Sequence, residues 1–408
     1  MHDEGVPPLP RLRYDLDFMP SPLPERPGLL IRDSLRFSET ALILPPPLAP
    51  LLRLFDGEQE ERELHYALHT LTGELDVEPL ARHLVDSLDH AGFLHNERFE
   101  QMRAERIRAF AEQPDRAPAH AGSGYPASAE ELRGLMGRYL QRDGAPADHG
   151  ARVGVAAPHV SPEGGWESYR DAFLALPREA EGRTFVILGT SHYGAPERFG
   201  LTRKNYVTPF GAARTDRAAV DFLAERAAAA VEMEDYCHAV EHSIEFQVVF
   251  LQALYGPEVN VLPVLCGPFA RSLYEGGPPE QDEGVARFFD ALREWSAGPG
   301  RDAFWVLGVD MAHIGRRYGD AVGAQAGDER MAEVERRDRE RIAALAAGAA
   351  EEYWSLVQPN HDDLRWCGSA PFYTFLRVVP EARAELRRYQ QWNIDPESVV
   401  SFAALRFG

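Results

Sequence analysis

Four apolar segments in the second half of the chain, each followed by a segment of helical character, constrain the fold more than any other feature. They are residues 152–159 (RVGVAAPH), 184–194 (TFVILGTSHYG), 259–267 (VNVLPVLCG) and 303–313 (AFWVLGVDMAH). Apolar strands that alternate with helices are typical of a largely parallel sheet covered by helices on both faces. We therefore predict an α/β fold for residues 119–408, with a mostly parallel sheet.

Three of these segments end in histidine, at His159, His192 and His313, and the last also carries Asp310. In open α/β sheets the ligand site lies beyond the carboxyl ends of the strands. A single histidine at such a position is most often structural, but three at equivalent strand ends are expected to meet at one edge. The pattern therefore predicts a site built from imidazoles.

Two further segments carry groups that could join this site. Residues 238–245 (HAVEHSIE) run into a plainly helical segment, and their spacing predicts that His238, Glu241, His242 and Glu245 share one helix face. Cys367 is followed by Gly368, which favours a tight turn that would direct the thiol into a cavity. Imidazole and thiolate are ligands suited to iron, copper and zinc.

The first part of the chain has a different pattern. Residues 1–27 are rich in proline and predicted to be extended; two short strands follow at 28–33 (GLLIRD) and 41–45 (ALILP). Helices are predicted at residues 47–55, 60–71 and 77–90, and an apolar AGFL segment follows at 91–94. This order resembles winged-helix recognition modules of the PqqD-like type, which bind a peptide as an added strand. A winged-helix scaffold without a peptide partner is the alternative.

These patterns divide the chain into a winged-helix-like module at residues 1–102, a charged helix leading into a Pro/Ala linker at 103–118, and the α/β domain at 119–408. Ser128, with Glu131 three residues later, is expected to cap the first helix of that domain.

Charge and cysteine usage exclude several function classes. The formal net charge of -21 disfavours binding to nucleic acid or to an anionic membrane surface, and the predicted helix at 77–90 is too acidic to read DNA. Three cysteines do not make a disulfide framework; Cys266 is expected in the core, and Cys237 lies next to His238. No apolar run is long enough to span a membrane, and the N-terminus lacks a signal-peptide pattern, so a cytoplasmic location is expected.

Six motifs occur in the order seen in the Memo family, which the α/β domain therefore resembles. They are PHVSPEGG (158–165), LGTSHYG (188–194), TPFG (208–211), EHSIEFQ (241–247), DMAHIG (310–315) and CG at Cys367. The AGSGYPASAEEL segment (121–132) is similar to the start of family members that accompany radical SAM proteins, the AmmeMemoRadiSam system protein B type.

The resemblance implies a fold similar to that of the class III extradiol dioxygenases. It implies a metal bound by His159, His192 and Cys367, with iron as the expected cofactor and copper or zinc as alternatives. His242, Asp310 and His313 match residues that line the same pocket and are the expected catalytic groups. Tyr193, where many relatives have a second histidine, and Val160-Ser161, where Ala-Gly is usual, alter the pocket wall and leave the substrate open.

Three functions compete on this basis. The first is a metal-dependent redox enzyme, dioxygenase-like, with His242 or His313 as general base, in a pathway with a radical SAM or peptide-modifying partner. The second is a non-enzymatic adaptor that recruits a peptide or protein through the N-terminal module. The third is a zinc peptidase, because His238-x-x-Glu241-His242 fits the H-x-x-E-H spacing, but it leaves the strand-end histidines unexplained.

Overall fold

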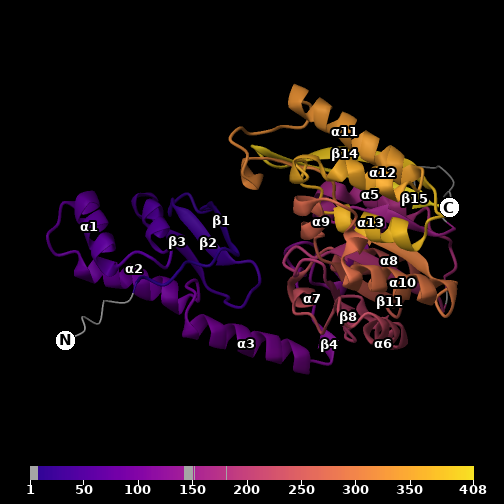
Figure 1. Cartoon of the computed structure of the whole chain (residues 1–408), viewed down its shortest axis with the longest axis horizontal. Coiled ribbons are helices and arrows are strands. Elements are labelled where there is room, and N and C mark those ends of the chain that lie inside the picture. Colours follow the sequence, from indigo (N-terminus) through magenta and orange to yellow (C-terminus); the bar gives the residue numbers. More distant parts are fainter. Residues whose placement is uncertain (1–7, 142–149, 151, 181) are drawn as a thin grey trace. The chain divides into compact units, whose positions relative to one another are not determined.

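The computed structural model describes residues 8–141, 150, 152–180 and 182–408, and the chain divides into two compact units (Figure 1). Unit 1 is Met1–Glu112 and unit 2 is Gln113–Gly408. None of the helices in the described ranges combines the length and the apolar character that a membrane crossing requires. Each unit is described separately below.

Unit 1 is a small antiparallel sheet of order β1-β2-β3 followed by helices. Its elements are β1 (Leu16–Pro20), β2 (Leu29–Asp33), β3 (Ala41–Leu44), the 3-10 helix η1 (Pro46–Leu54), α1 (Glu61–Thr72), α2 (Glu78–His90) and α3 (Glu97–Glu112). The two predicted strands and the predicted helices are present, although the segment at 47–55 is a 3-10 helix. β1 lies in the proline-rich segment that was expected to be merely extended; residues 1–7 of that segment lie outside the described residues.

A buried ion pair joins three parts of unit 1. The guanidinium of Arg13 donates to Asp33 in β2 (2.9 Å) and to the carbonyl of Gly92 (3.0 Å), and it lies 4.0 Å from the ring centroid of Phe99 in α3. Both side chains of the ion pair are fully shielded from solvent. A buried charge is tolerated only when it is paired and hydrogen-bonded, so this arrangement fixes the N-terminal segment against the sheet and helices.

Unit 2 contains a 12-stranded sheet in the described residues, whose main path is β13-β15-β5-β12-β6-β11-β9-β8-β4. Its strands are β4 (Asp115–Arg116), β5 (Gly154–Ala157), β6 (Thr184–Thr190), β7 (Phe199–Leu201), β8 (Asn205–Thr208), β9 (Gly211–Thr215), β10 (Val231–Met233), β11 (Asn260–Cys266), β12 (Phe304–Gly308), β13 (His313–Gly315), β14 (Ala384–Asp395) and β15 (Ser398–Phe407). The four predicted strands are β5, β6, β11 and β12, and they are neighbours that run parallel.

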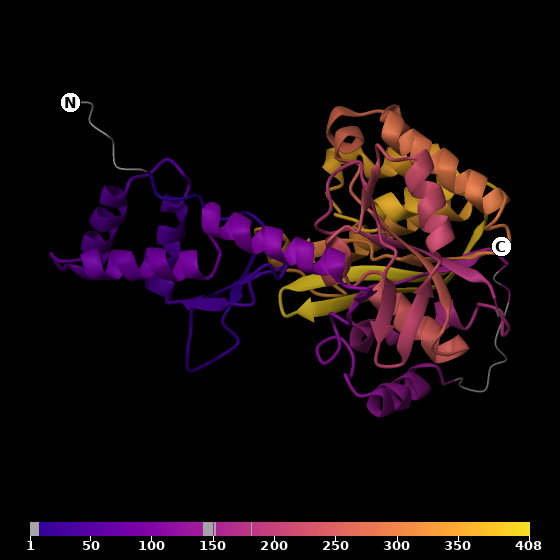
Figure 2. The same ribbon diagram turned by 90° about the horizontal axis from the view of Figure 1, so that it is seen from below.

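Helices cover both faces of this sheet (Figure 2). The helices of unit 2 are α4 (Ala129–Tyr139), α5 (Pro162–Phe173), α6 (Arg217–Arg226), α7 (Cys237–Val240), α8 (Glu245–Tyr255), α9 (Ala270–Glu275), α10 (Glu283–Ala297), α11 (Glu329–Ala346), α12 (Ala350–Val357) and α13 (Ser369–Val378), with 3-10 turns η2 (Pro279–Gln281), η3 (Arg316–Tyr318) and η4 (Pro359–His361). Side chains that alternate along each strand enter two separate cores: Val186 and Leu188 pack with α6, α10 and α13, and Phe185 and Ile187 pack with α4, α5 and α8. The predicted α/β architecture is therefore present.

The register of the central strands decides where the polar strand ends lie. Gly308 at the end of β12 is opposite Ala157 of β5 on one side and Gly189 of β6 on the other. His159 and His192 follow these positions by two and three residues. The two histidines therefore leave the sheet at the same edge, as their place in the sequence predicted.

Residues 103–118, which were predicted as a helix leading into a linker, complete α3 and then form β4, which pairs with β8 in parallel. Ser128 caps α4 as predicted, because its side chain accepts from the backbone N–H of Glu131.

Candidate metal centre

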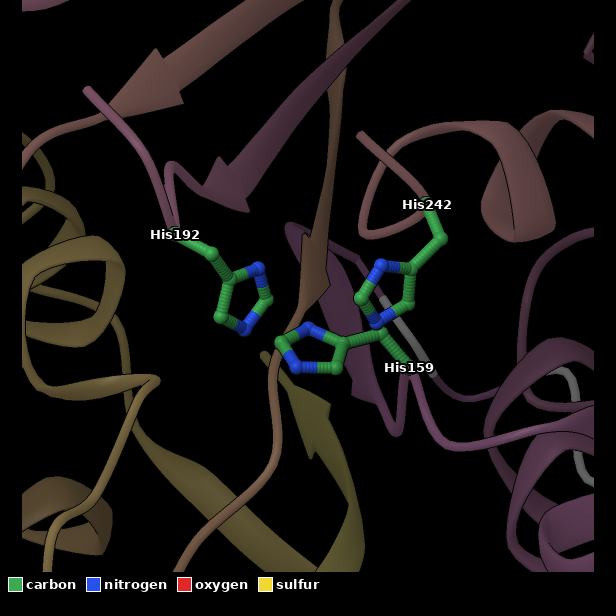
Figure 3. Close-up of side chains that lie close together, drawn as sticks. All are labelled: His159, His192 and His242. Atoms are coloured by element: carbon green, nitrogen blue, oxygen red, sulfur yellow. The ribbon is translucent and has the colours of Figure 1, made fainter. Parts of the chain in front are cut away.

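Three histidines from separate segments of unit 2 point toward one another (Figure 3). His159 follows β5, His192 follows β6, and His242 lies in the short segment between α7 and α8. Each pair of ring centroids is 5.0 Å apart. One ligand nitrogen from each ring lies within 4.8 Å of the other two. This is a spacing from which three imidazoles can share one metal ion with small adjustments.

Contacts at Nδ1 determine which nitrogen of each ring is left to bind a metal. The Nδ1 atom of His159 lies 2.9 Å from the carbonyl oxygen of Gly308, so it carries the proton and donates. Nδ1 of His192 lies 2.9 Å, and Nδ1 of His242 3.2 Å, from the same carboxylate oxygen of Glu241. With Nδ1 next to these oxygens, Nε2 is the nitrogen left to bind a metal, which is the arrangement that metal-binding histidines use; in His192 this nitrogen must first release a proton.

The Glu241 carboxylate is fully buried and acts as the common anchor. It also accepts the backbone N–H groups of His192 and His242, each at 2.9 Å. Burial alone would raise the pKa of Glu241, but the imidazoles of His192 and His242 hold it well below 4.5. Burial would lower the pKa of His192, and the adjacent carboxylate instead raises it well above 6.5. From the sequence, Glu241 entered only as part of a peptidase pattern, because spacing alone does not distinguish an anchor from a catalytic base.

Two glycines allow the segment that carries Glu241 and His242 to lie directly on the strand ends. A Cβ at Gly308 would come within 2.1 Å of the carbonyl oxygen of Ser243, and one at Gly189 within 2.6 Å of its hydroxyl oxygen. The Ser243 hydroxyl donates to the carbonyl of Thr190 at 2.8 Å. The close backbone approach therefore needs glycine at the ends of both β6 and β12.

The prediction that residues 238–245 share one helix face is wrong. The helix α7 ends at Val240, Glu241 is extended (φ −71°, ψ 138°), and α8 begins only at Glu245. His238 is buried, and its ring nitrogens lie 2.6 Å from the Tyr206 hydroxyl and 3.0 Å from the Gly200 carbonyl. The pair of histidines that a zinc peptidase of the H-x-x-E-H type requires is therefore not formed.

Arg116 supports the same segment from its other side. Its guanidinium is buried and donates to the carbonyl oxygens of His238 (2.8 Å) and Glu241 (2.9 Å), and it forms an ion pair with Glu245. Glu245 in turn accepts the backbone N–H of His120 at 3.0 Å. Thus the polypeptide that enters unit 2 at β4 holds in place the segment that bears Glu241 and His242.

A second group of ligand atoms adjoins the first at His159. The Cys367 sulfur lies 3.2 Å from Nε2 of His159, and a carboxylate oxygen of Asp310 lies 3.4 Å from the same nitrogen. The other Asp310 oxygen accepts the backbone N–H of His159 at 2.8 Å. Cys367 and Gly368 form the tight turn that was predicted, which the Ser369 N–H closes by donating to the Trp366 carbonyl at 3.0 Å. Gly368 has an ordinary φ of −76°, and a Cβ there would lie 2.7 Å from the Asp310 carbonyl oxygen, so the glycine also permits close packing.

Burial governs the protonation of this second group. It raises the pKa of Asp310 to about 7 and raises the pKa of the Cys367 thiol, although His192 opposes the latter shift. Burial lowers the pKa of His313 to about 4. Nδ1 of His313 lies 2.9 Å from the carbonyl oxygen of Met311, so Nε2 of this neutral ring keeps its lone pair. His313 belongs to neither ligand group found among the described residues.

Asp338 of α11 braces the elements that carry Cys367 and Asp310. It accepts from the Trp366 indole (2.6 Å), the Tyr389 hydroxyl (2.7 Å) and the Ser401 hydroxyl (2.6 Å). The same Ser401 oxygen accepts the backbone N–H of Ala312 at 2.8 Å. One buried carboxylate thus connects the residue before Cys367 with the loop that follows β12.

The other two cysteines and His361 lie apart from these ligand groups. Cys266 is buried in the core between β11 and the helices, as predicted. Cys237 is buried in the opposite core, and its backbone N–H donates to Asp235. His361 is exposed, with its ring 4.8 Å from that of Tyr274.

The sequence profile of the Memo-like proteins matches residues 116–406, which span almost all of unit 2. The chain belongs to the Memo-like protein family. A MEMO1 family protein of Aquifex aeolicus is 27% identical to this chain, in an alignment that covers 93% of this chain and 95% of the Aquifex protein. A MEMO1 family protein of Thermococcus kodakarensis is 29% identical to this chain, in an alignment that covers 72% of this chain and 99% of the Thermococcus protein. The Memo family predicted from the six motifs is thereby confirmed.

The match with the Aquifex protein leaves out a part of this chain that is much shorter than unit 1. The match therefore covers most of unit 1. Among solved structures, an uncharacterized protein of Escherichia coli K12 aligns with 59% of this Memo-like chain and 90% of its own. The two are 12% identical, with a TM-score of 0.35.

The first prediction concerns the anchor of the histidines. In Glu241→Gln the pKa of His192 should fall from well above 6.5 to below it, because burial remains while the carboxylate is lost. NMR titration of the imidazole resonances in metal-free protein measures this change. Glu258→Gln, which alters an exposed ion pair with Arg214, is the control and should leave His192 unchanged. An unchanged His192 titration in Glu241→Gln would contradict the assigned contact.

The second prediction concerns the brace. Burial raises the pKa of Asp338 from 3.8 to about 6. Between these values the folded protein retains a proton that the unfolded chain has released, so the free energy of unfolding should decline as the pH rises through this window. Asp338→Asn should lose this contribution to the pH dependence, as measured by urea unfolding at several pH values. The same slope in both proteins would show that Asp338 titrates normally.

Proposed function

We propose that this Memo-like protein binds one redox-active transition-metal ion through His159, His192 and Cys367 and acts as a metal-dependent oxidoreductase. Iron is the proposed metal, and copper is its main rival. One observation carries the proposal: Nδ1 of His159 and of His192 contacts an oxygen, which leaves Nε2 as the ligand atom of each ring, and the Cys367 sulfur lies 3.2 Å from Nε2 of His159. These donors are the borderline and soft ligands that iron, copper and zinc take in proteins.

The chemistry of the donor set fits such a metal. Two imidazoles and one thiolate would occupy three positions and leave others for water or substrate, as catalytic metal sites require. A bound ion of this kind supplies Lewis-acid and one-electron chemistry. The side chain of His192 is about a quarter exposed, whereas that of His159 is buried, so the centre is open to solvent on the His192 side.

Residues beside the proposed ligands can hold and move protons. Nε2 of His313 belongs to a ring whose pKa burial lowers to about 4, so the ring is neutral and its lone pair is exposed to a proton donor near neutral pH. Asp310, with a pKa of about 7, changes protonation near neutral pH and also fixes the backbone of His159. We assign general-base roles to His313 and His242, and the positioning of His159 to Asp310. These are the roles that proton transfer at such a centre calls for.

The decisive experiment is metal analysis of protein purified without chelators. Metal content should fall in His159→Ala, His192→Ala and Cys367→Ser, because each change removes a donor. Metal affinity should rise with pH, since His192 and Cys367 carry protons in the metal-free protein and must release them. Asp235→Asn, a buried carboxylate near Cys237, is a control outside the ligand groups. Full retention of metal in all three variants would refute the proposal.

We also propose that unit 1 recruits a peptide or a protein partner, such as a radical SAM protein, in the manner of PqqD-like modules. Two observations support it: β1 and β3 are edge strands of a small sheet, and edge strands are templates for an added strand. In addition, the Aquifex relative shares most of unit 1. This adaptor role is compatible with a metal centre in unit 2.

Panning of a random peptide library against the full chain tests this role. Peptides should be enriched on the wild type. If they pair with β3, the Ile43→Pro variant should lose them; if they pair with β1, the Phe18→Pro variant should lose them. Proline removes the N–H that strand pairing needs. A matching proline substitution at the exposed Tyr274 of unit 2 is the control. Failure to enrich any peptide on the wild type would count against the adaptor role.

A further inference from the structure

Unit 1 carries its own group of three possible metal ligands, on residues that the centre of unit 2 does not use. Glu61 and His65 lie four residues apart on α1, and Glu78 is the first residue of α2. A spacing of four places Glu61 and His65 on the same face of α1. The helices α1 and α2 contact each other within unit 1 (Figure 1). As a result, one ligand atom from each of the three residues lies within 4.8 Å of the other two.

The Nε2 atom of His65 is the common contact of this group. It lies 3.2 Å from a carboxylate oxygen of Glu78 and 3.8 Å from one of Glu61. This nitrogen is shielded from solvent, yet it has no hydrogen-bond partner among the described residues, so neither contact has the geometry of a hydrogen bond. Around a tetrahedral ion with ligands at about 2.1 Å, neighbouring ligand atoms lie about 3.4 Å apart and off the axis of each lone pair. The position of Nε2 therefore fits a metal ligand better than a hydrogen-bond donor.

The charges around Nε2 favour a cation. Arg82 forms an ion pair with Glu78 through the oxygen Oε1, which leaves Oε2 of the same carboxylate facing His65. In the described part of the chain no arginine or lysine pairs with Glu61, which approaches only the imidazole of His65. The two carboxylates thus converge within 4.8 Å of each other, and like charges at this distance repel. A cation between them would remove this repulsion.

The ligand types and their exposure indicate which cation fits. One imidazole and two carboxylates are nitrogen and oxygen ligands that zinc accepts, and the group lacks the thiolate that a soft ion such as copper(I) prefers. The side chains of Glu61 and Glu78 are 44% and 46% exposed, so an ion can enter from solvent. Three protein ligands leave the fourth tetrahedral position for water, which this exposure allows.

We propose that Glu61, His65 and Glu78 bind a zinc ion that joins α1 to α2 within unit 1. The site is separate from the centre of unit 2 and does not rest on the function proposed above. Both helices contribute buried side chains to one core, and the ion adds a link between the first turns of the two helices on its surface. Because the three ligands meet only when both helices are in place, zinc binding stabilises this part of unit 1.

Zinc titration of the metal-free full-length chain against a competing chelator tests the proposal, in a variant that lacks two proposed ligands of unit 2, His159→Ala/Cys367→Ser. This double variant should still bind one zinc ion per chain. Adding His65→Gln should weaken zinc binding by about 100-fold or more, because the site loses its nitrogen ligand. Adding His83→Gln, the same change at an exposed histidine of α2, is the control and should leave zinc affinity unchanged. If His65→Gln does not fold, as judged by circular dichroism, Glu61→Gln takes its place.

Hydrogen exchange of the double variant, measured by mass spectrometry, locates the bound ion. Zinc should slow amide exchange in α1 and α2, and His65→Gln should abolish this effect. The site is overturned if the double variant binds no zinc, or if His65→Gln and His83→Gln bind zinc equally well. Slowed exchange confined to unit 2 would overturn it too. If the double variant does not fold, His65→Gln in the wild-type chain should lower the zinc stoichiometry by one, and an unchanged stoichiometry would refute the site.

Discussion

The geometry of the centre depends on one buried carboxylate. Glu241 binds two imidazoles and two backbone N–H groups, which come from the end of β6 and from the segment before α8. A buried carboxylate must be compensated by charge or hydrogen bonds, so the burial of Glu241 itself demands these partners. Because both Nδ1 atoms are thereby committed, His192 and His242 present the same nitrogen to the same space.

Two other buried groups of unit 2 stabilise the surroundings of Glu241 and of Cys367. From one side, Arg116 fixes the carbonyl of Glu241, so the first strand of unit 2 stabilises the segment that carries the carboxylate. From the other side, Asp338 ties Trp366 and Ser401 together and so fixes the surroundings of Cys367. The parallel register of β5, β12 and β6 lies between them and brings their polar ends to one edge. The centre is thus assembled on rigid elements rather than on a single loop.

Sequence reasoning succeeded where the signal was local and periodic. The strands β5, β6, β11 and β12 are apolar runs buried on both faces, which leaves few other interpretations. It failed where long-range contacts outweighed local spacing. Residues 238–245 have helical spacing, yet Arg116 and Ser243 hold the backbone extended at Glu241. β1 escaped notice because a short, proline-flanked strand is specified mainly by its pairing with β2.

The sequence alone determined that apolar strands alternate with helices and that His159 and His192 leave the sheet at one edge, because each histidine directly follows an apolar strand and parallel strands end at the same edge. It also identified Cys367, but only through the family resemblance. The tertiary structure decided that Glu241 anchors two rings, that His238 points elsewhere, and that Cys367 lies beside His159, 208 positions away in the chain. Contacts across such separations depend on how layers pack, and neither periodicity nor spacing in one sequence encodes that packing.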